Sequence, residues 1–117
     1  MAIYETTVPG TLVEVKDHII HNISYLGFSI SVGDESEGII DNTKYCVIGL
    51  ERFGLLSQNR LSLNLTLLEF SQGVRIIAIS LGASQGALVK INTWSENSFL
   101  NDFRSIIDKY IEIREER

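Results

Sequence analysis

The segment from Arg60 to Leu81 constrains the fold of this chain more than any other stretch. Its first half alternates polar residues with a row of leucines, namely Leu61, Leu63, Leu65 and Leu67. A period of two places these leucines on one face of a β-strand and the polar residues on the other. Ser71-Gln72-Gly73 interrupts the run, and its glycine can adopt the positive φ of a tight turn. The segment therefore predicts a β-hairpin at the centre of a sheet.

The returning strand of this hairpin is apolar on both of its faces. Its apolar residues are Val74, Ile76, Ile77 and Ile79. A strand that is buried on both faces needs a cover on each side. Helices, a second subunit or a ligand can supply that cover.

Three further segments have the composition of strands. Ala2 to Val8 is rich in β-forming residues and ends at Pro9-Gly10. Phe28, Ile30 and Val32 alternate with serines in a second strand that ends at Gly33. Thr43 to Phe53 alternates about Cys46, which we expect to be a small buried hydrophobic residue.

An acidic stretch, Gly33 to Asn42, lies between the second and third predicted strands. Its carboxylates are Asp34, Glu35, Glu37 and Asp41. Acidic residues with Gly and Asn are common in turns, so this stretch predicts a solvated hairpin loop. The ten residues do not match the EF-hand pattern, and we do not expect calcium binding there.

Two segments predict helices. Thr11 can cap the first, with Glu14 completing a capping box and Gly27 ending the helix. Its apolar stripe comprises Leu12, Val15, Ile19, Ile23 and Leu26. Thr93 or Ser95 can cap the second helix, near the end of the chain. Its broader stripe comprises Phe99, Leu100, Phe103, Ile106, Ile107, Tyr110 and Ile111.

The stretch Gly82 to Gly86 predicts a turn that leads into a short strand, Ala87 to Ile91. A phosphate-binding glycine loop normally opens a helix, so a turn is favoured over a phosphate site. Together the elements predict one α+β domain over residues 1–117. Its antiparallel sheet has five to six strands with two helices on one face, in the order β-α-β-β-β-β-(β)-α.

Composition limits the partners and the cellular location that we expect for this domain. The net charge of −5 gives no general attraction to phosphate backbones, so nucleic acid is not an expected partner. No apolar run approaches the ~20 residues of a membrane span, and the start MAIYETTVPG lacks a secretory pattern. The single Cys46 cannot form an internal disulfide. We therefore expect a cytoplasmic protein with no membrane contact.

The candidate chemistry lies on the first helix, where Glu14, His18 and His21 are spaced by four and three residues. This spacing brings a carboxylate and two imidazoles onto one face, where they can bind zinc or perform acid-base work. No nucleophile elbow, Walker loop, H-E-x-x-H motif or cysteine pair is present. We therefore expect no catalytic residues and no cofactor, and an enzyme or metal-binding protein at this helix face is the alternative.

A binding or assembly module is the favoured function. A curved sheet closed by a long helix can enclose an apolar pocket for a small hydrophobic ligand. The residues that can line such a pocket are Phe28, Leu65, Phe70, Ile79, Trp94 and Phe103. The same apolar sheet face, with Val13 and Ile20 of the first helix, can instead be buried against a second subunit. A homodimer is the expected partner arrangement.

The stretches Gly82-Ala83-Ser84-Gln85-Gly86 and Lys90-Ile91-Asn92-Thr93-Trp94, followed by the final helix, resemble a family of small uncharacterised bacterial proteins over nearly the full length. The order of elements also resembles the TATA-binding-protein-like and helix-grip folds. The family resemblance implies a bacterial cytosolic origin and supplies no catalytic residues. The fold resemblance implies a hydrophobic cavity.

Overall fold

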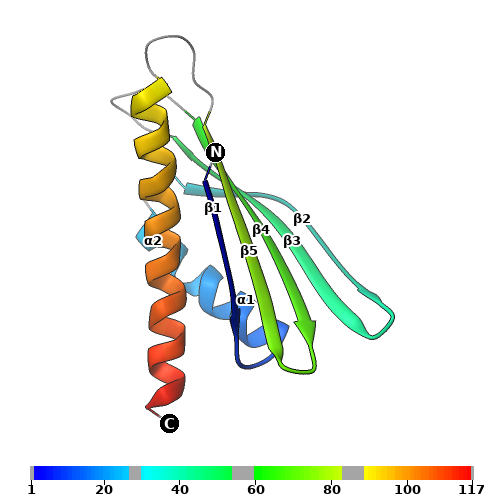
Figure 1. Ribbon diagram of the computed structural model, residues 1–117. Coiled ribbons are helices and arrows are strands. Elements are labelled where there is room, and N and C mark those ends of the chain that lie inside the picture. Colours follow the sequence, from blue (N-terminus) through cyan, green and yellow to red (C-terminus); the bar gives the residue numbers. More distant parts are fainter. Residues whose placement is uncertain (1, 27–29, 54–59, 83–88, 117) are drawn as a thin grey trace.

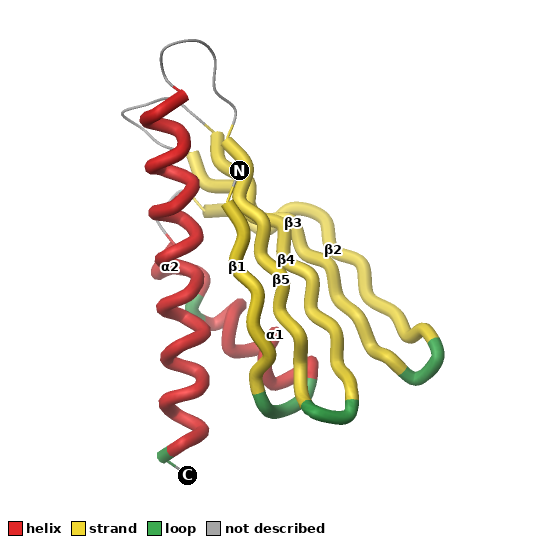
Figure 2. The backbone as a smooth tube through the Cα atoms, viewed as in Figure 1, coloured by secondary structure: helices red, strands yellow, loops and turns green. Residues whose placement is uncertain are grey.

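The computed structural model describes residues 2–26, 30–53, 60–82 and 89–116, and for residues 89–97 it describes the backbone alone. In chain order the elements are β1 (Ala2–Val8), α1 (Leu12–His21), the 3-10 helix η1 (Ile23–Leu26), β2 (Ile30–Ile40), β3 (Thr43–Phe53), β4 (Arg60–Phe70), β5 (Gly73–Gly82) and α2 (Val89–Glu115). The strands form one five-stranded antiparallel sheet in the order β1-β5-β4-β3-β2. Both helices cover one face of it (Figure 1 and Figure 2). The predicted α+β class and element order are confirmed, with five strands.

β4 lies at the centre of the sheet, and its leucine row forms the floor of the core. Leu63, Leu65 and Leu67 are fully buried and Leu61 is nearly so. In register beside them on β5 are Ile76 and Ala78, which are also fully buried. The sequence period of two therefore sorts the sheet into a core face under the helices and an outer face that points away from them.

The two helices cover the core face with the stripes that the sequence predicts. Thr11 caps α1, and its side chain and that of Glu14 form the expected capping box. α1 and η1 bury Leu12, Val15, Ile19 and Leu26. α2 buries Phe99, Leu100, Phe103, Ile106, Ile107 and Tyr110. Burial of so many large apolar side chains supplies most of the driving force for this two-layer fold.

The acidic stretch is a strand and not a loop, which corrects the prediction for Gly33 to Asn42. β2 pairs with β3 as far as Ile40↔Thr43, with a register irregularity between Val32 and Glu35. The turn consists of Asp41 and Asn42, both at positive φ, which is the backbone twist of a two-residue hairpin. Charged residues are tolerated because β2 is an edge strand whose side chains are mostly exposed.

Two helix boundaries also differ from the predictions. α1 ends at His21 with Asn22 as its C-cap, and the chain continues as η1, while Gly27 lies outside the described residues. α2 begins at Val89, so the strand predicted for Ala87 to Ile91 is wrong over its described part, and Thr93 and Ser95 lie inside the helix. Within the described ranges, no helix is long and apolar enough to cross a membrane.

The turn between β4 and β5 depends on Gly73. This residue has a φ of 136°, as the hairpin prediction requires. A Cβ at this position would overlap the backbone oxygen of Val8, at the end of the neighbouring strand β1. Gly73 therefore allows the β4–β5 turn to approach the backbone that leads into α1.

We expect Gly73→Ala to lower the free energy of unfolding by more than about 2 kcal/mol, because the new methyl group meets backbone and the φ is unfavourable for alanine. Gly38→Ala is the matched control, since a Cβ there meets only the ring of Tyr45, which can rotate away. Urea unfolding of both variants measures the difference. Equal losses for the two variants would contradict this account of Gly73.

Candidate functional site

The two helices lie side by side on the core face and meet along a line that we call the helix seam. It runs between α1–η1 on one side and residues 102–114 of α2 on the other. Three contacts cross or close it: Arg52 with Asp102, His18 with the Ile106 carbonyl, and Glu14 with Arg114. Between these contacts the helices leave two cavities.

Arg52, on β3, holds the end of the seam where η1 lies beside Asp102 of α2. Its Nη1 donates to the Leu26 carbonyl at 2.9 Å and to Asp102 Oδ2 at 3.0 Å. Its guanidinium also lies 4.3 Å above the centre of the Phe99 ring. One side chain of β3 therefore holds η1 and α2 together, with its charge paired and its planar face against an aromatic ring.

His18 makes the central contact. Its Nε2 lies 2.8 Å from the Ile106 carbonyl oxygen, and its ring packs edge-on against Tyr110 at 5.3 Å. A carbonyl only accepts hydrogen bonds, so Nε2 carries a proton and donates. Nδ1 faces the Asn22 side-chain nitrogen at 3.5 Å. His18 thus acts as a hydrogen-bonded link between the helices.

The far end of the seam is closed by an ion pair. Arg114 Nη1 lies 2.8 Å from Glu14 Oε2. The Arg114 hydrogen bond, followed by those from Thr11, lowers the pKa of Glu14 below its ordinary value. Beside this pair, the Tyr110 hydroxyl donates to the Pro9 carbonyl at 2.7 Å and ties α2 to the β1–α1 turn.

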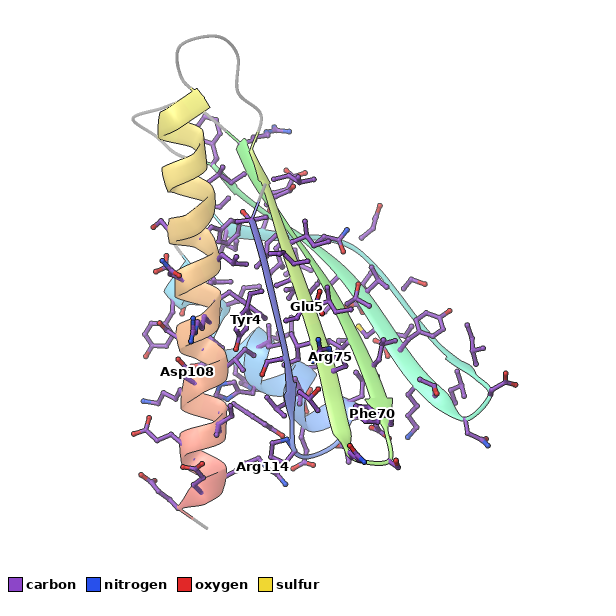
Figure 3. All side chains as sticks on the ribbon, in the orientation of Figure 1. Tyr4, Glu5, Phe70, Arg75, Asp108 and Arg114 are labelled. Carbon is purple, nitrogen blue, oxygen red and sulfur yellow. The ribbon has the colours of Figure 1, made fainter. Side chains whose placement is uncertain are left out.

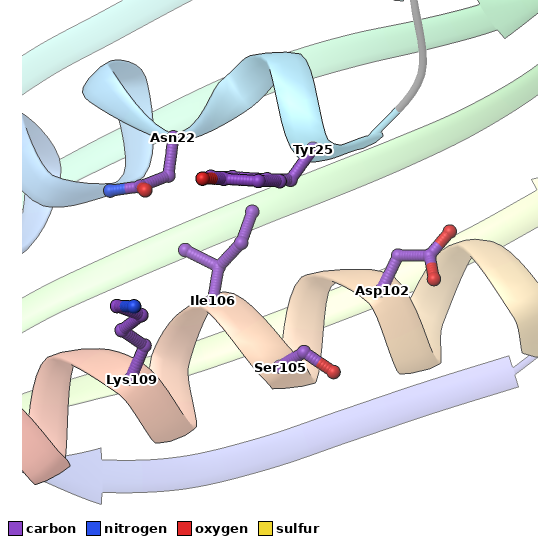
Figure 4. Close-up of a pocket in the computed structure, with 6 residues that line it drawn as sticks. All are labelled: Asn22, Tyr25, Asp102, Ser105, Ile106 and Lys109. Atoms are coloured by element: carbon purple, nitrogen blue, oxygen red, sulfur yellow. The ribbon is translucent and has the colours of Figure 1, made fainter.

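The two cavities differ in their polar lining. The Lys109 cavity, of about 340 Å³, is lined by Asn22, Tyr25, Asp102, Ser105, Ile106 and Lys109 (Figure 4). The Arg114 cavity, of about 310 Å³, is lined by Glu14, His18, Tyr110, Ile113 and Arg114. The sequence spacing correctly placed Glu14 and His18 near each other. It gave no signal for Asp102 or Lys109, because both belong to a helix face that sequence alone assigns to solvent.

The structure gives the three predicted metal ligands separate partners. Glu14 pairs with Arg114, and His18 Nε2 is bonded to a backbone carbonyl. His21 is exposed, and its Nδ1 lies 2.7 Å from the Asp17 carbonyl. A metal at these residues stays a prediction. Within the described part of the chain, the one group of three or more His, Cys, Asp or Glu side chains whose ligand atoms all lie within 4.8 Å of one another is Glu35, Glu37 and Cys46.

The two carboxylates of that group already share a lysine as their partner. Lys16 of α1 reaches across to β2, where its Nζ forms ion pairs with Glu37 and, at 3.3 Å, with Glu35. The hydrogen bond to Glu37 is the main reason that the pKa of Lys16 is raised. Burial raises the pKa of the Cys46 thiol, as expected for a buried hydrophobic residue. Lys16 therefore occupies the position that a cation would take.

The outer face of the sheet is the second candidate surface. Its apolar members on β1, β3, β4 and β5, identified by the strand registers, are Ile3, Tyr45, Val47, Phe53, Leu68, Phe70, Ile77, Ile79 and Leu81. Four of these are large and well exposed, namely Ile3, Phe53, Phe70 and Leu81 (57%, 40%, 41% and 45% exposed), and Ile79 is half-buried. Glu5 and Arg75 form an ion pair at 2.6 Å between neighbouring strands of this face (Figure 3).

The six predicted pocket residues do not all gather at one place. Leu65 and Phe103 are fully buried in the core between sheet and helices. Phe70 and Ile79 belong to the outer face, on the other side of the sheet. Phe28 and the side chain of Trp94 lie outside the described part of the structure. Of the two additional contact candidates on α1, Val13 is 63% exposed and Ile20 is half-buried.

We expect Arg52→Met to lower the free energy of unfolding by about 1–3 kcal/mol, because it leaves the Leu26 carbonyl and Asp102 without their donor. Arg60→Met is the matched control, since Arg60 is exposed and lies 3.9 Å from Glu51. Its loss should stay within about 0.5 kcal/mol. Urea unfolding compares the two, and similar losses would rule out the role given to Arg52.

Cys46 should react slowly with iodoacetamide in the folded protein. Burial blocks access, and a raised pKa means that a smaller fraction of the thiol is ionised at any given pH. At pH 8 we expect alkylation about 100-fold slower than in strong denaturant, measured by mass spectrometry. Alkylation at the same rate in both conditions would contradict the buried placement.

Comparison with known proteins identifies a family for this chain. A search of curated proteins finds no match. A family model described as "Family of unknown function (DUF6054)" matches residues 1–111, which spans every described strand and nearly all of α2. This chain belongs to the DUF6054 family.

Proposed function

We propose that this protein is a non-catalytic assembly module that forms a homodimer through the outer face of its sheet. The observation that carries this proposal is the one-sided placement of the helices, because no described helix covers the apolar side chains of the outer face. Exposed apolar side chains that gather on one face of a sheet mark an interaction site.

The charge distribution supports a second copy as the occupant. On β1, β3, β4 and β5, the charged residues of the outer face are Glu5, Glu51, Arg60 and Arg75, two of each sign. They form the ion pairs Glu5–Arg75 and Glu51–Arg60. The whole chain carries a net charge of −5. Two copies can therefore meet at this face without the repulsion that their other surfaces would produce.

The size of the face also suits a dimer. Five strands about 4.8 Å apart and about ten residues long present roughly 800 Å². A standard interface buries about 800 Å² on each partner. A small hydrophobic ligand fits this surface less well, because ligand sites are concave and the Lys109 and Arg114 cavities both lie in the helix seam.

A bacterial cytoplasm is the setting that we propose for this dimer. The single cysteine supports it, because the chain has no internal disulfide that would need an oxidising compartment. The family resemblance drawn from the Gly82 to Trp94 stretch supports a bacterial source. Localisation of a tagged protein in fractionated cells tests this part of the proposal separately from the dimer.

We expect the protein to be a dimer at about 50 µM, in the range of ordinary homodimer affinities, by sedimentation velocity. Ile3→Lys with Leu81→Lys should shift it to monomer, since both side chains are exposed and lie on the outer face. Val13→Lys, an equally exposed change on α1, should leave the dimer intact. Circular dichroism confirms that each variant is folded. A monomeric wild-type protein, or equal dissociation by the α1 variant, would rule out this interface.

A further inference from the structure

We propose that the Lys109 cavity is a binding site for a small aromatic carboxylate. The cavity lies between η1 and α2, and its volume of about 340 Å³ is within the usual range of small-molecule sites. It is on the helix side of the sheet, opposite the outer face. The site therefore stays open in the proposed dimer, and the two proposals stand independently.

The charge of the lining favours an anion. Asp102 is neutralised by Arg52, whose Nη1 lies 3.0 Å from its Oδ2. Lys109 has no ion-pair or hydrogen-bond partner among the residues that the structure describes. The neighbouring Arg114 cavity lacks this feature, because its arginine is paired with Glu14. The Lys109 cavity thus has one uncompensated positive charge.

The hydrogen-bonding groups of the lining agree with that charge. Ser105 Oγ donates its proton to the Asn101 carbonyl, and Asn22 Nδ2 donates to the His18 carbonyl. The second N–H of the Asn22 amide faces His18 Nδ1 at 3.5 Å. The donors that remain for a ligand among these lining residues are the ammonium group of Lys109 and the hydroxyl group of Tyr25. Figure 4 shows the Tyr25 hydroxyl directed toward Asn22, with Lys109 below it, so these groups gather at one end of the cavity. A carboxylate can accept hydrogen bonds from both donors.

The Tyr25 ring and Ile106 form the apolar part of the lining, which favours a flat ring. Tyr25 is 73% exposed, and Figure 4 shows its ring facing the side chain of Ile106 across the cavity. An aromatic side chain left this open offers a stacking surface at little cost in conformational entropy. In a ligand with one aromatic ring and a short carboxylate substituent, the ring can pack between Tyr25 and Ile106 while the carboxylate binds Lys109.

The test uses phenylacetate as the probe, titrated to about 10 mM into ¹⁵N-labelled protein and followed by ¹H–¹⁵N chemical shifts. Phenylacetamide and 2-phenylethylammonium are the neutral and cationic analogues. We expect shifts confined to residues 22–26 and 102–109, and binding of phenylacetate that is several-fold tighter than that of either analogue. The expected preference reflects the charged hydrogen bond to Lys109.

Two matched variants give the decisive comparison. Lys109→Gln should weaken phenylacetate binding about three- to tenfold, because it keeps the length of the side chain and removes the charge. Lys44→Gln removes the same charge from exposed Lys44 at the β2–β3 hairpin and should leave binding unchanged. Tyr25→Ala should weaken phenylacetate and phenylacetamide alike, since both use the ring.

Four outcomes would overturn the proposal: no shift at the highest concentration, shifts centred elsewhere, equal affinity for the three probes, or equal effects of the two lysine variants. Because Lys109 and Tyr25 are exposed, their substitution should not disturb folding. The thermal midpoint of each variant checks this. The sedimentation experiment on the outer face is unaffected by any of these results.

Discussion

Burial of the β4 leucine row beneath two helices is the constraint on which the rest of the structure depends. The row lies at the centre of the sheet and sets the face against which α1 and α2 pack. Because both helices serve the same face, they meet along a seam and leave the opposite face of the sheet open. The helix seam and the outer face are the two candidate functional surfaces. Both therefore result from the packing of α1 and α2 on the same face of the sheet.

The fold was largely predictable from local patterns. The period of two located β3 and β4 to the residue, and the apolar stripe and capping box located α1. The predictions were wrong in two segments, β2 and the start of α2, where the local composition indicates a different structure from the one that the folded chain adopts. The acidic residues of β2 suggested a loop, yet pairing with β3 holds them in an edge strand that tolerates charge. Val89 to Ile91 suggested a strand, yet these residues are the first turn of α2.

The candidate sites were less predictable, because they depend on contacts between residues far apart in the chain. Glu14 and His18 are one turn apart on α1, so their proximity was visible in the sequence. The Arg52–Asp102 pair joins residues 50 positions apart, and the Tyr110–Pro9 bond spans 101 positions. No spacing rule within one element can anticipate such pairs. The same reason explains why Lys109 and Tyr25, on different elements, gave no signal of a shared cavity.

The β2 edge strand has a further consequence for how this chain behaves in a crowded solution. Its irregular register at Val32–Glu35 and its carboxylates on Glu35 and Glu37 make a poor template for another strand. A chain that approached this edge would have to match the bulge and displace Lys16 or accommodate the ion pairs that it forms with Glu35 and Glu37. The sheet is thus protected on this side from the open-ended strand addition that produces fibrils.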